Sequence, residues 1–433
     1  MSALPRRVVA VCAVAMLLIG MAGAADASPR HGYYATKTPY QQRQDARTYE
    51  PAPRGFKPIF TQLVTRHGSR GLSDADDITF LEQVIATAGP NVTKLGAQLL
   101  PALQSLDAAN KKLGYGNLSS LGRQEQTDLA TRLAHRLPAL FEDAVVGGRH
   151  VSVLDAGVQR DVDSESEFVT SLENAVPRLS PLVGAPVTDK KLLYFHKSDP
   201  DYVKWSKSDP ALLAKLKEIT YSETSLRTAV KCLNRLFSAD FVRQLGQSAV
   251  DVVLALYAVY SIEPGLSGEG SWHFERFLPE GVARHFAYVD DADSFYSKGP
   301  SFAGTTITFK MAKVLEDDFF KAVTSAANGG TDVARLRFTH AEEILPLAAL
   351  MHLPGSDQQA SATYTYWNND FRGARVAPMS ANIQWDVYRD ASGTLLVKML
   401  YNEKETAFQP TCRPYRPGSN FYTFTELKRC YGY

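Results

Sequence analysis

The pattern of apolar and polar positions predicts three strands, each followed by a helix. Residues 56–64 form a short apolar run typical of a buried strand, and residues 150–155 (HVSVLD) alternate as a strand does. Residues 334–340 (ARLRFTH) predict a third strand with a helix directly after it. Strands that alternate with helices along a chain are typical of α/β proteins, so we expect a central, mostly parallel sheet flanked by helices.

Helical patterns occupy the segments between these strands, near residues 77–88 and 95–113. Residues 117–141 predict one long amphipathic helix, which Ser119 or Ser120 can cap. Its apolar face is made of residues four positions apart, namely Leu129, Leu133, Leu137 and Phe141. Near the C-terminus, NIQWDVYR and TLLVKMLY flank the turn sequence DASG, which predicts a β-hairpin.

The way the composition changes along the chain also predicts its domain organisation. Residues 196–299 are more helical than their flanks, and we interpret them as an α-helical cap inserted into the α/β core. The core then comprises residues 56–195 and 300–433, with a helical insert at about 73–116. Residues 28–55 are polar, with several prolines and tyrosines, and are expected to form an extended arm.

The N-terminus has the pattern of a secretory signal peptide. Arg6 and Arg7 precede an apolar run, and Ala25 and Ala27 fit a small-x-small cleavage site. Residues 1–27 are therefore expected to be removed, and the protein to be periplasmic or secreted. The alternative is a single membrane anchor, which the short run disfavours. No later segment suggests a membrane span, so we expect no membrane association after cleavage.

Charge and cysteine content narrow the possible partners and cofactors of the protein further. The chain has 47 Lys and Arg against 46 Asp and Glu, and the predicted signal holds two of the former and one of the latter, which leaves a formally neutral mature chain. Nothing in that balance suggests a nucleic-acid partner. Cys12 lies in the signal, whereas Cys412 and Cys430 could pair in an exported protein and leave Cys232 free. No zinc-type spacing occurs, and neither a metal nor another cofactor is expected.

The loops after the three strands carry the candidate chemistry. They hold Arg66, His67 and Arg70 in "VTRHGSRG", Arg160 after the second strand, and His340 and Glu342 after the third. Ligands bind at the carboxyl ends of strands in α/β sheets, so these loops converge if the strands are parallel neighbours. Arginine forks match phosphate oxygens and a helix N-terminus adds N–H donors. The sequence therefore predicts a phosphate site.

These residue types fit phosphoryl transfer. The imidazole of His67 is a competent nucleophile, and cations beside it lower its pKa and keep it neutral in mild acid. Glu342 is the best-placed proton donor, because the next residue on a helix, Glu343, points about 100° away. The alternatives are a phosphate binder, which needs neither His67 nor Glu342, and a metallohydrolase, for which HAEE lacks a third ligand. The remaining histidines, His196 among them, are interpreted as surface or core residues.

The order RHGSR, then Arg160, then HAE resembles the histidine phosphatase superfamily, specifically its branch of histidine acid phosphatases and phytases. Within that branch, the tripeptide at 340–342 is similar to the multiple inositol polyphosphate phosphatases, and the likeness covers most of residues 33–408. The resemblance implies a phosphoglycerate-mutase-like core. One departure is Gly71, which stands where the common motif continues with proline.

The resemblance also implies roles. His67 is expected to become phosphohistidine and Glu342 to protonate the leaving group. The phosphate pocket is expected to consist of Arg66, Arg70, Arg160 and His340. The implied function is a secreted phosphomonoesterase that acts on phytate and lower inositol phosphates; the alternative is a broad acid phosphatase acting on sugar phosphates or other small monoesters.

A substrate with several phosphates needs cations beyond the one phosphate pocket. The candidates for such contacts are Lys37, Lys190, Lys191, Lys197 and Lys204. Each of them is equally well explained as a solvated lysine.

Overall fold

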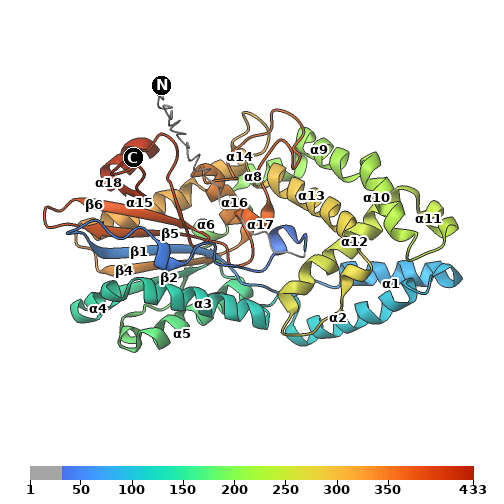
Figure 1. Cartoon of the computed structure of the whole chain (residues 1–433), viewed down its shortest axis with the longest axis horizontal. Helices are drawn as coiled ribbons and strands as arrows, with labels where there is room; N and C mark the ends of the chain where they lie inside the picture. The colour runs from blue at the N-terminus through green and yellow to red at the C-terminus, as the bar shows by residue number, and fades with distance from the viewer. Residues whose placement is uncertain (1–31) are drawn as a thin grey trace, which may run out of the picture. The chain divides into compact units, whose positions relative to one another are not determined.

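The computed structural model describes residues 32–433, so the predicted signal peptide at residues 1–27 lies outside the described residues. The centre of the described chain is an eight-stranded sheet (Figure 1). Its strands are β1 (Lys57–Arg66), β2 (His150–Asp155), β3 (Val187–Thr188), β4 (Asp332–Thr339), β5 (Asn382–Arg389), β6 (Leu395–Tyr401), β7 (Lys404–Thr406) and β8 (Phe421–Thr423). Their order is β3-β2-β4-β1-β5-β6-β7, and β8 also pairs with β6.

The central strands of the sheet are parallel. β1 pairs with β4, β4 with β2 and β2 with β3 in parallel, whereas β5 to β8 extend the sheet in antiparallel fashion. The three strands predicted from the apolar pattern are β1, β2 and β4, and they are neighbours. The α/β class with a central parallel sheet is confirmed. The predicted hairpin is β5–β6, where Gly393 has a φ of 88°, a conformation that glycine adopts without strain.

Helices cover both faces of the sheet (Figure 1). α3, α4 and α5 pack on one face through a cluster of apolar side chains that includes Leu63, Leu133 and Phe168, and α15 and α18 lie on the other. The helices on the two faces of the sheet and around its carboxyl ends are α3 (Ser120–Arg136), α4 (Pro138–Gly147), α5 (Gln159–Ala175), α6 (Lys190–Leu193), α7 (Phe195–Ser198), α14 (Ile307–Lys310), α15 (Lys313–Ala327), α16 (Ala341–Leu350), α17 (Gly373–Val376) and α18 (Phe424–Tyr431).

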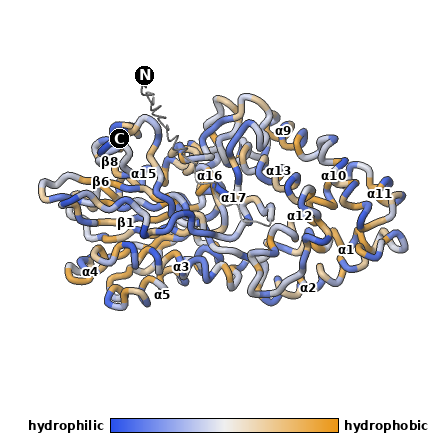
Figure 2. Tube along the Cα trace, viewed as in Figure 1, coloured by the Kyte–Doolittle hydropathy of each residue, from blue (hydrophilic) through white to orange (hydrophobic). Residues whose placement is uncertain are grey.

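A second, helical body lies beside the carboxyl ends of the parallel strands (Figure 1). It comprises α1 (Asp76–Ala88), α2 (Leu99–Leu113), α8 (Pro200–Ser208), α9 (Pro210–Thr220), α10 (Glu223–Leu233), α11 (Ala239–Leu245), α12 (Ala249–Ile262) and α13 (Glu280–Ser297). α1 packs against α12, so the segment expected as an insert of the core joins the helices expected as a cap. The outer helices alternate hydrophobic and hydrophilic residues (Figure 2), as helices with one buried face do.

α12 is the central helix of this body. All but three of its 14 residues are buried, which explains why its sequence is apolar all round. Within residues 32–433, the stretch from Ala239 to Leu266 alone has the length and composition of a membrane span, and 61% of its most apolar window is buried inside the protein. Its apolar character is therefore accounted for by packing in the described fold.

The prediction of one long helix at 117–141 is wrong in one respect. It is divided into α3 and α4 at Leu137, which has φ −125° and ψ 47°. The residue before a proline avoids the helical region, and Pro138 then begins a new helix. The predicted apolar face survives the break, since Leu129, Leu133, Leu137 and Phe141 are all buried.

Two further segments tie the fold together. Residues 33–55 form an arm with two short 3-10 helices, Ala35–Lys37 and Ala46–Thr48. The first of these contacts α12 and α13, and farther along the arm the Tyr40 N–H donates to Glu125 (2.8 Å) and the Glu50 N–H to Glu405 (2.8 Å). A disulfide joins Cys412, in the loop before β8, to Cys430 of α18, with Cα atoms 5.2 Å apart.

Candidate active site

The register of the sheet brings the three predicted loops together. Arg66, the last residue of β1, pairs with Thr339, the last residue of β4. The His67 N–H donates to the Thr339 carbonyl (2.8 Å), so the loop that holds His67 begins where β4 gives way to α16. β2 lies on the other side of β4, and α5 follows it after a short turn. Neither α5 nor α16 has a side-chain cap, which leaves their first N–H groups directed at the same end of the sheet.

Three guanidinium groups meet at this point, and all are incompletely paired. Arg66 donates through Nη1 to the Ala377 carbonyl (2.8 Å), Arg70 through Nη1 to the Gly71 carbonyl (2.7 Å). The Nε atoms of Arg66, Arg70 and Arg160 are buried and have no hydrogen-bond partner among the described residues. Burial and the neighbouring cations lower the pKa of Arg66 to about 9 and that of Arg70 to about 10, so both stay charged at neutral pH. Buried, charged donors without partners are a site for an anion.

His67 lies among these cations in one defined orientation. Its Nδ1 is 2.9 Å from the Gly68 carbonyl, which can only accept, so Nδ1 carries the proton and Nε2 has a free lone pair. Burial first, and then the charge of Arg66, hold the pKa of His67 well below its usual range. The imidazole is therefore neutral and nucleophilic even in mild acid.

His340 is held on both sides by residues of α5. Its Nδ1 lies 3.2 Å from Nη2 of Arg160, and its Nε2 lies 2.9 Å from the Asp161 carboxylate. Asp161 is fully buried and was not among the predicted residues. Its position directly after Arg160, on the first turn of a helix that starts at the sheet's carboxyl edge, is the signal that could have found it.

Glu342 and Glu343 have different surroundings. Glu343 is fully buried, lies 2.5 Å from Nδ1 of His196, and accepts from the Thr339 hydroxyl (3.2 Å). The Glu342 side chain is 32% exposed, and its Oε1 lies 3.5 Å from Nζ of Lys298. Burial raises the pKa of Glu342, but the surrounding cations, Lys298 first, outweigh that effect and hold the pKa well below its usual range. Glu342 is thus the accessible carboxylate of the pair.

The histidine interpreted as an ordinary core residue has a place in this site. His196 packs edge-on against His340, with ring centroids 6.0 Å apart, and also contacts Tyr194. It comes from α7, so only the folded chain brings it next to α16. Between residues 32 and 433, no group of three or more His, Cys, Asp or Glu side chains has a metal-binding arrangement.

Comparisons with known proteins identify relatives of this chain. The multiple inositol polyphosphate phosphatase of Bifidobacterium longum, solved with inositol hexasulfate, is 31% identical, covers 93% of this chain and 97% of its own, and superposes with a TM-score of 0.88. This chain belongs to the multiple inositol polyphosphate phosphatase family. The same bacterial protein solved with phosphate gives a TM-score of 0.89. No family model matches the chain.

More distant relatives agree with that assignment. Multiple inositol polyphosphate phosphatase 1 of Gallus gallus is 23% identical across 92% of this chain and 89% of its own length. The phytase from D. castellii shares the fold, with a TM-score of 0.68 at 14% identity over 92% of this chain and 84% of its own. The resemblance predicted from RHGSR and HAE is therefore confirmed.

The loop that holds His67 is fixed by close backbone contact with α3. A Cβ atom on Gly68 would lie 2.3 Å from the Gly122 carbonyl oxygen, and one on Gly122 would lie 2.0 Å from the Ser69 carbonyl oxygen. Gly68 does not have a positive φ, so it is required for this close approach rather than for a turn. The Ser164 hydroxyl accepts from the Gly68 N–H (3.1 Å) and thereby links the loop to α5.

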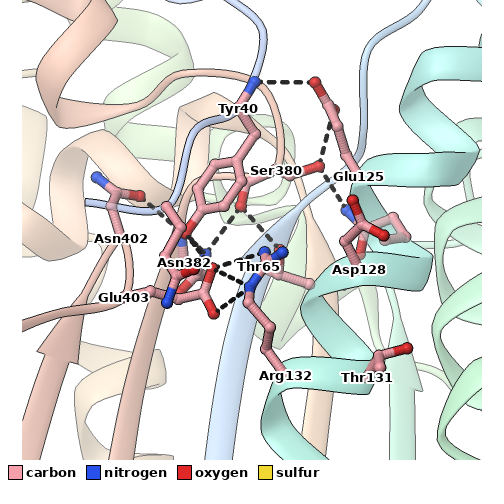
Figure 3. Close-up of polar contacts among 12 residues, drawn as sticks. Tyr40, Thr65, Glu125, Asp128, Thr131, Arg132, Ser380, Asn382, Asn402 and Glu403 are labelled. Atoms are coloured by element: carbon pink, nitrogen blue, oxygen red, sulfur yellow. Dashed lines mark hydrogen bonds and ion pairs between the residues drawn. The ribbon is translucent and has the colours of Figure 1, made fainter. Parts of the chain in front are cut away.

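A buried carboxylate fixes the same loop from behind. Glu125 accepts from the N–H and the hydroxyl of Ser69, both at 2.8 Å, and from Ser380 at 3.0 Å. Figure 3 shows Glu125 next to the Tyr40 backbone nitrogen, while the Tyr40 hydroxyl donates to Glu403, which is paired with Arg132. This network joins α3, the arm and the antiparallel edge of the sheet to the residue that follows Gly68.

The departure from proline at Gly71 has a local compensation. A Cβ there would lie 2.5 Å from Oδ1 of Asn110, and that oxygen accepts from the Leu72 N–H (2.7 Å). The Gly71 N–H donates to the Asn117 carbonyl (3.1 Å). Side-chain and backbone bonds from α2 and the segment after it hold the loop that proline would otherwise stiffen.

The five predicted lysines are distributed differently. Lys37 lies 3.3 Å from Asp290 and lines a cavity of about 220 Å³ with Tyr257 and Asp293. The side chain of Lys190 lies over Gly157, in the turn just before Arg160, because a Cβ on Gly157 would be 3.1 Å from Lys190 Cε. The other candidates are exposed on α6 to α8 and form no ion pair within the described part of the chain: Lys191, Lys197 and Lys204.

The contact between Gly68 and Gly122 gives a direct test. Gly122→Ala places a methyl group against a backbone oxygen, so the loop must shift. A displacement of about 1 Å at a catalytic group can cost a hundredfold in rate, and we expect kcat to fall at least about tenfold, with a lower Tm. Steady-state kinetics and thermal unfolding measure both.

Gly281→Ala is the matched control. A Cβ on Gly281, in α13, meets no atom within 4 Å, and alanine favours a helix by up to about 1 kcal/mol. This variant should keep its kcat, and its Tm should stay the same or rise by a few degrees. Unchanged kinetics in Gly122→Ala, or an equal loss in both variants, would contradict the proposed role of the contact.

Proposed function

We propose that this protein hydrolyses phytate and lower inositol phosphates through a phosphohistidine intermediate. The observation that carries the proposal is the set of three guanidinium groups around the neutral imidazole of His67, each with a buried Nε atom that has no partner among residues 32–433. Such a pocket stabilises the charge on the equatorial oxygens of a transferring phosphoryl group. Membership of the multiple inositol polyphosphate phosphatase family supports the substrate class.

In the first step, the phosphate ester binds with its oxygens at Arg66, Arg70 and Arg160. The lone pair on His67 Nε2 attacks phosphorus in line, the N–P bond forms, and the P–O bond to the inositol breaks. The leaving oxygen takes a proton from Glu342, while the Nδ1 proton of His67 stays hydrogen-bonded to the Gly68 carbonyl.

In the second step, water attacks the phosphohistidine. The Glu342 carboxylate takes a proton from this water, the N–P bond breaks, and inorganic phosphate and neutral His67 are released. Asp161 holds His340 in place throughout, at 2.9 Å from its Nε2, so that the imidazole keeps its position at the wall of the pocket.

The protonation of Glu342 depends on the charge of the substrate. The cations around Glu342 favour its carboxylate form. A bound phosphate dianion offsets those cations and raises the pKa of Glu342, because a nearby negative charge disfavours a second one. Substrate binding therefore favours the protonated form that the leaving group needs.

A cluster of exposed lysines in the chain after β3 supports a polyphosphorylated substrate. The exposed Lys190, Lys191, Lys197 and Lys204 follow β3 in the chain, and Tyr194 of the same segment lies 5.1 Å from His340 between ring centroids. Their charges are not consumed by ion pairs with the described residues and so attract further phosphates. Lys37, already paired with Asp290, is a weaker candidate for such a contact.

We also propose that the protein is exported. The support is the N-terminal sequence pattern, with Arg6 and Arg7 before an apolar run and Ala25 and Ala27 after it. Expression of the full chain in a secreting bacterial host should give mature protein outside the cytoplasm that begins near Ser28, as read by N-terminal sequencing. Full-length protein retained in the membrane fraction would favour the anchor instead.

The covalent step is tested by His67→Ala. We expect this variant to lose turnover of phytate by a factor of about a thousand or more, because no other side chain replaces the nucleophile. Wild-type enzyme mixed with ³²P-labelled phytate and quenched in alkali should carry label, since phosphohistidine is stable in alkali, whereas His67→Ala should carry none.

His135→Ala is the control for this experiment, because His135 is exposed on α3, away from the strand ends. It should be labelled and should turn over like the wild type. Absence of label in the wild type would eliminate the covalent mechanism. A wild-type kcat/KM for glucose 1-phosphate as high as that for phytate would favour the broad acid phosphatase.

The proton donor is tested by Glu342→Gln. Glutamine keeps the shape but supplies no acidic proton, so esters with alkoxide leaving groups should slow by about a hundredfold or more. Nitrophenyl phosphate, whose leaving group needs no proton, should slow much less in the phosphorylation step. The comparison is made by single-turnover kinetics, and an equal loss with both substrates would remove Glu342 from this role.

A further inference from the structure

A lysine that the phosphate pocket does not use lies next to the proposed proton donor. The side-chain nitrogen of Lys298 is 3.5 Å from Glu342 Oε1 and 3.8 Å from Asp293 Oδ2, and the side chain is 25% exposed. Its backbone is fixed at the end of α13, where the Lys298 N–H donates to the Ser294 carbonyl (3.1 Å). A fixed backbone with a partly exposed ammonium group places a movable charge at the mouth of the site.

The ion pairs of Lys298 are loose. Both distances exceed those of charge-assisted hydrogen bonds, which are about 2.7–2.9 Å. A lysine ammonium is a compact charge on a flexible stem, so a phosphate dianion arriving beside it competes well with two single carboxylates. Lys298 is thus able to exchange Glu342 for a substrate phosphate with little rearrangement.

The other charges that face Glu342 already have partners or a role. The groups that act on Glu342 are Arg66 at the end of β1, Arg70 in the loop after it, His340 at its own helix start, Tyr194, His196 of α7, Tyr202 of α8, Asp293 of α13 and the neighbouring Glu343. Asp290 of α13 acts on Lys298 itself. The arginines and His340 form the phosphate pocket, and His196 is bonded to Glu343. Lys298 is the cation of this set that neither the phosphate pocket nor Glu343 engages.

We propose that Lys298 is a positioning residue that couples the protonation of Glu342 to the presence of a second phosphate on the substrate. In the free enzyme Lys298 keeps Glu342 as a carboxylate. When an inositol polyphosphate binds, a phosphate next to the scissile one draws Lys298 away, and Glu342 takes up a proton from solvent. That proton then passes to the leaving oxygen as the His67 N–P bond forms and the P–O bond breaks.

This inference rests on the proposed function, since it needs Glu342 as the proton donor. It goes further in predicting which substrates make the donor competent. Monoesters with a single phosphate leave Lys298 beside Glu342, so Glu342 is less fully protonated in their complexes than in those of polyphosphates. Polyphosphates release the donor, and the enzyme's preference for them comes partly from catalysis rather than from binding alone.

The test compares inositol hexakisphosphate with inositol 1-phosphate, which have similar alkoxide leaving groups. Lys298→Met removes the coupling. The ratio of kcat for the hexakisphosphate to kcat for the 1-phosphate, at fixed pH, should then fall by about tenfold for each unit by which the pKa of Glu342 differs between the two wild-type complexes. For inositol 1-phosphate, the decline of kcat/KM with rising pH should move to higher pH in Lys298→Met, because loss of the cation raises the pKa of Glu342. Asp293→Asn removes a negative charge and should move that decline to lower pH.

Two controls complete the design. Lys298→Arg keeps the charge and should preserve both the substrate ratio and the pH profile, which also decides the matter if Lys298→Met does not fold. Lys313→Met removes an ion-paired lysine in α15, bonded to Asp317 at 2.7 Å, and should change neither quantity.

The contrary outcomes are distinct. Lys298→Met could raise only the KM for the hexakisphosphate and leave the pH dependence of kcat/KM unchanged for both substrates. That result would show a simple phosphate contact and overturn the coupling. An altered pH profile in Lys298→Arg would do the same. In either case, alkaline-stable labelling of His67 and turnover of nitrophenyl phosphate remain normal, so failure of the coupling is separable from failure of the proposed function.

Discussion

Positive charge gathered where three parallel strands end, with donors left unpaired, is the constraint on which this structure depends. Arg66, Arg70 and Arg160 each keep a buried Nε without a partner in the described part of the chain. Buried charged donors of this kind cost folding free energy, and the surrounding structure must hold them in place against their mutual repulsion. Around this point the fold supplies rigid backbone, close glycine contacts and a few fixed carboxylates.

The carboxylates have divided roles that follow from their depth. Glu125 and Asp161 are buried and bonded or paired to the residues that shape the pocket, Ser69 and His340. Glu343 is occupied by His196, while Glu342 remains accessible beside Lys298. The arm takes part through Tyr40, so a segment with little regular structure helps to fix the loop that holds His67 (Figure 3).

The sequence predicted the parts of this site that are local. Arg66 and His67 lie at the end of β1, and Arg160 and Glu342 lie in the first turns of the helices that follow β2 and β4. The apolar pattern placed these strands correctly because the burial of a strand is reflected in its own run of residues. The break at Leu137 shows the limit of periodicity, since Pro138 interrupts a pattern that is otherwise continuous.

Residues missed by the sequence act across long separations. His196 meets Glu343 from 147 positions away, Glu125 reaches Ser380 over 255, and Lys298 lies at the end of a helix whose place beside α16 follows from tertiary packing. A lone histidine or lysine has no pattern of its own, and only a folded chain reveals what it touches. The close approach of Gly68 to Gly122 is of the same kind, because a glycine's reason lies in the atom opposite.

The most direct measurement of the central claim is a crystal structure of the protein with vanadate, which mimics a phosphoryl group in transfer. The account predicts vanadium bonded to His67 Nε2, with its equatorial oxygens within hydrogen-bonding distance of the Nε atoms of Arg66, Arg70 and Arg160. Vanadate bound away from the ends of β1 and β4, or held there with His67 turned away from it, would contradict the account.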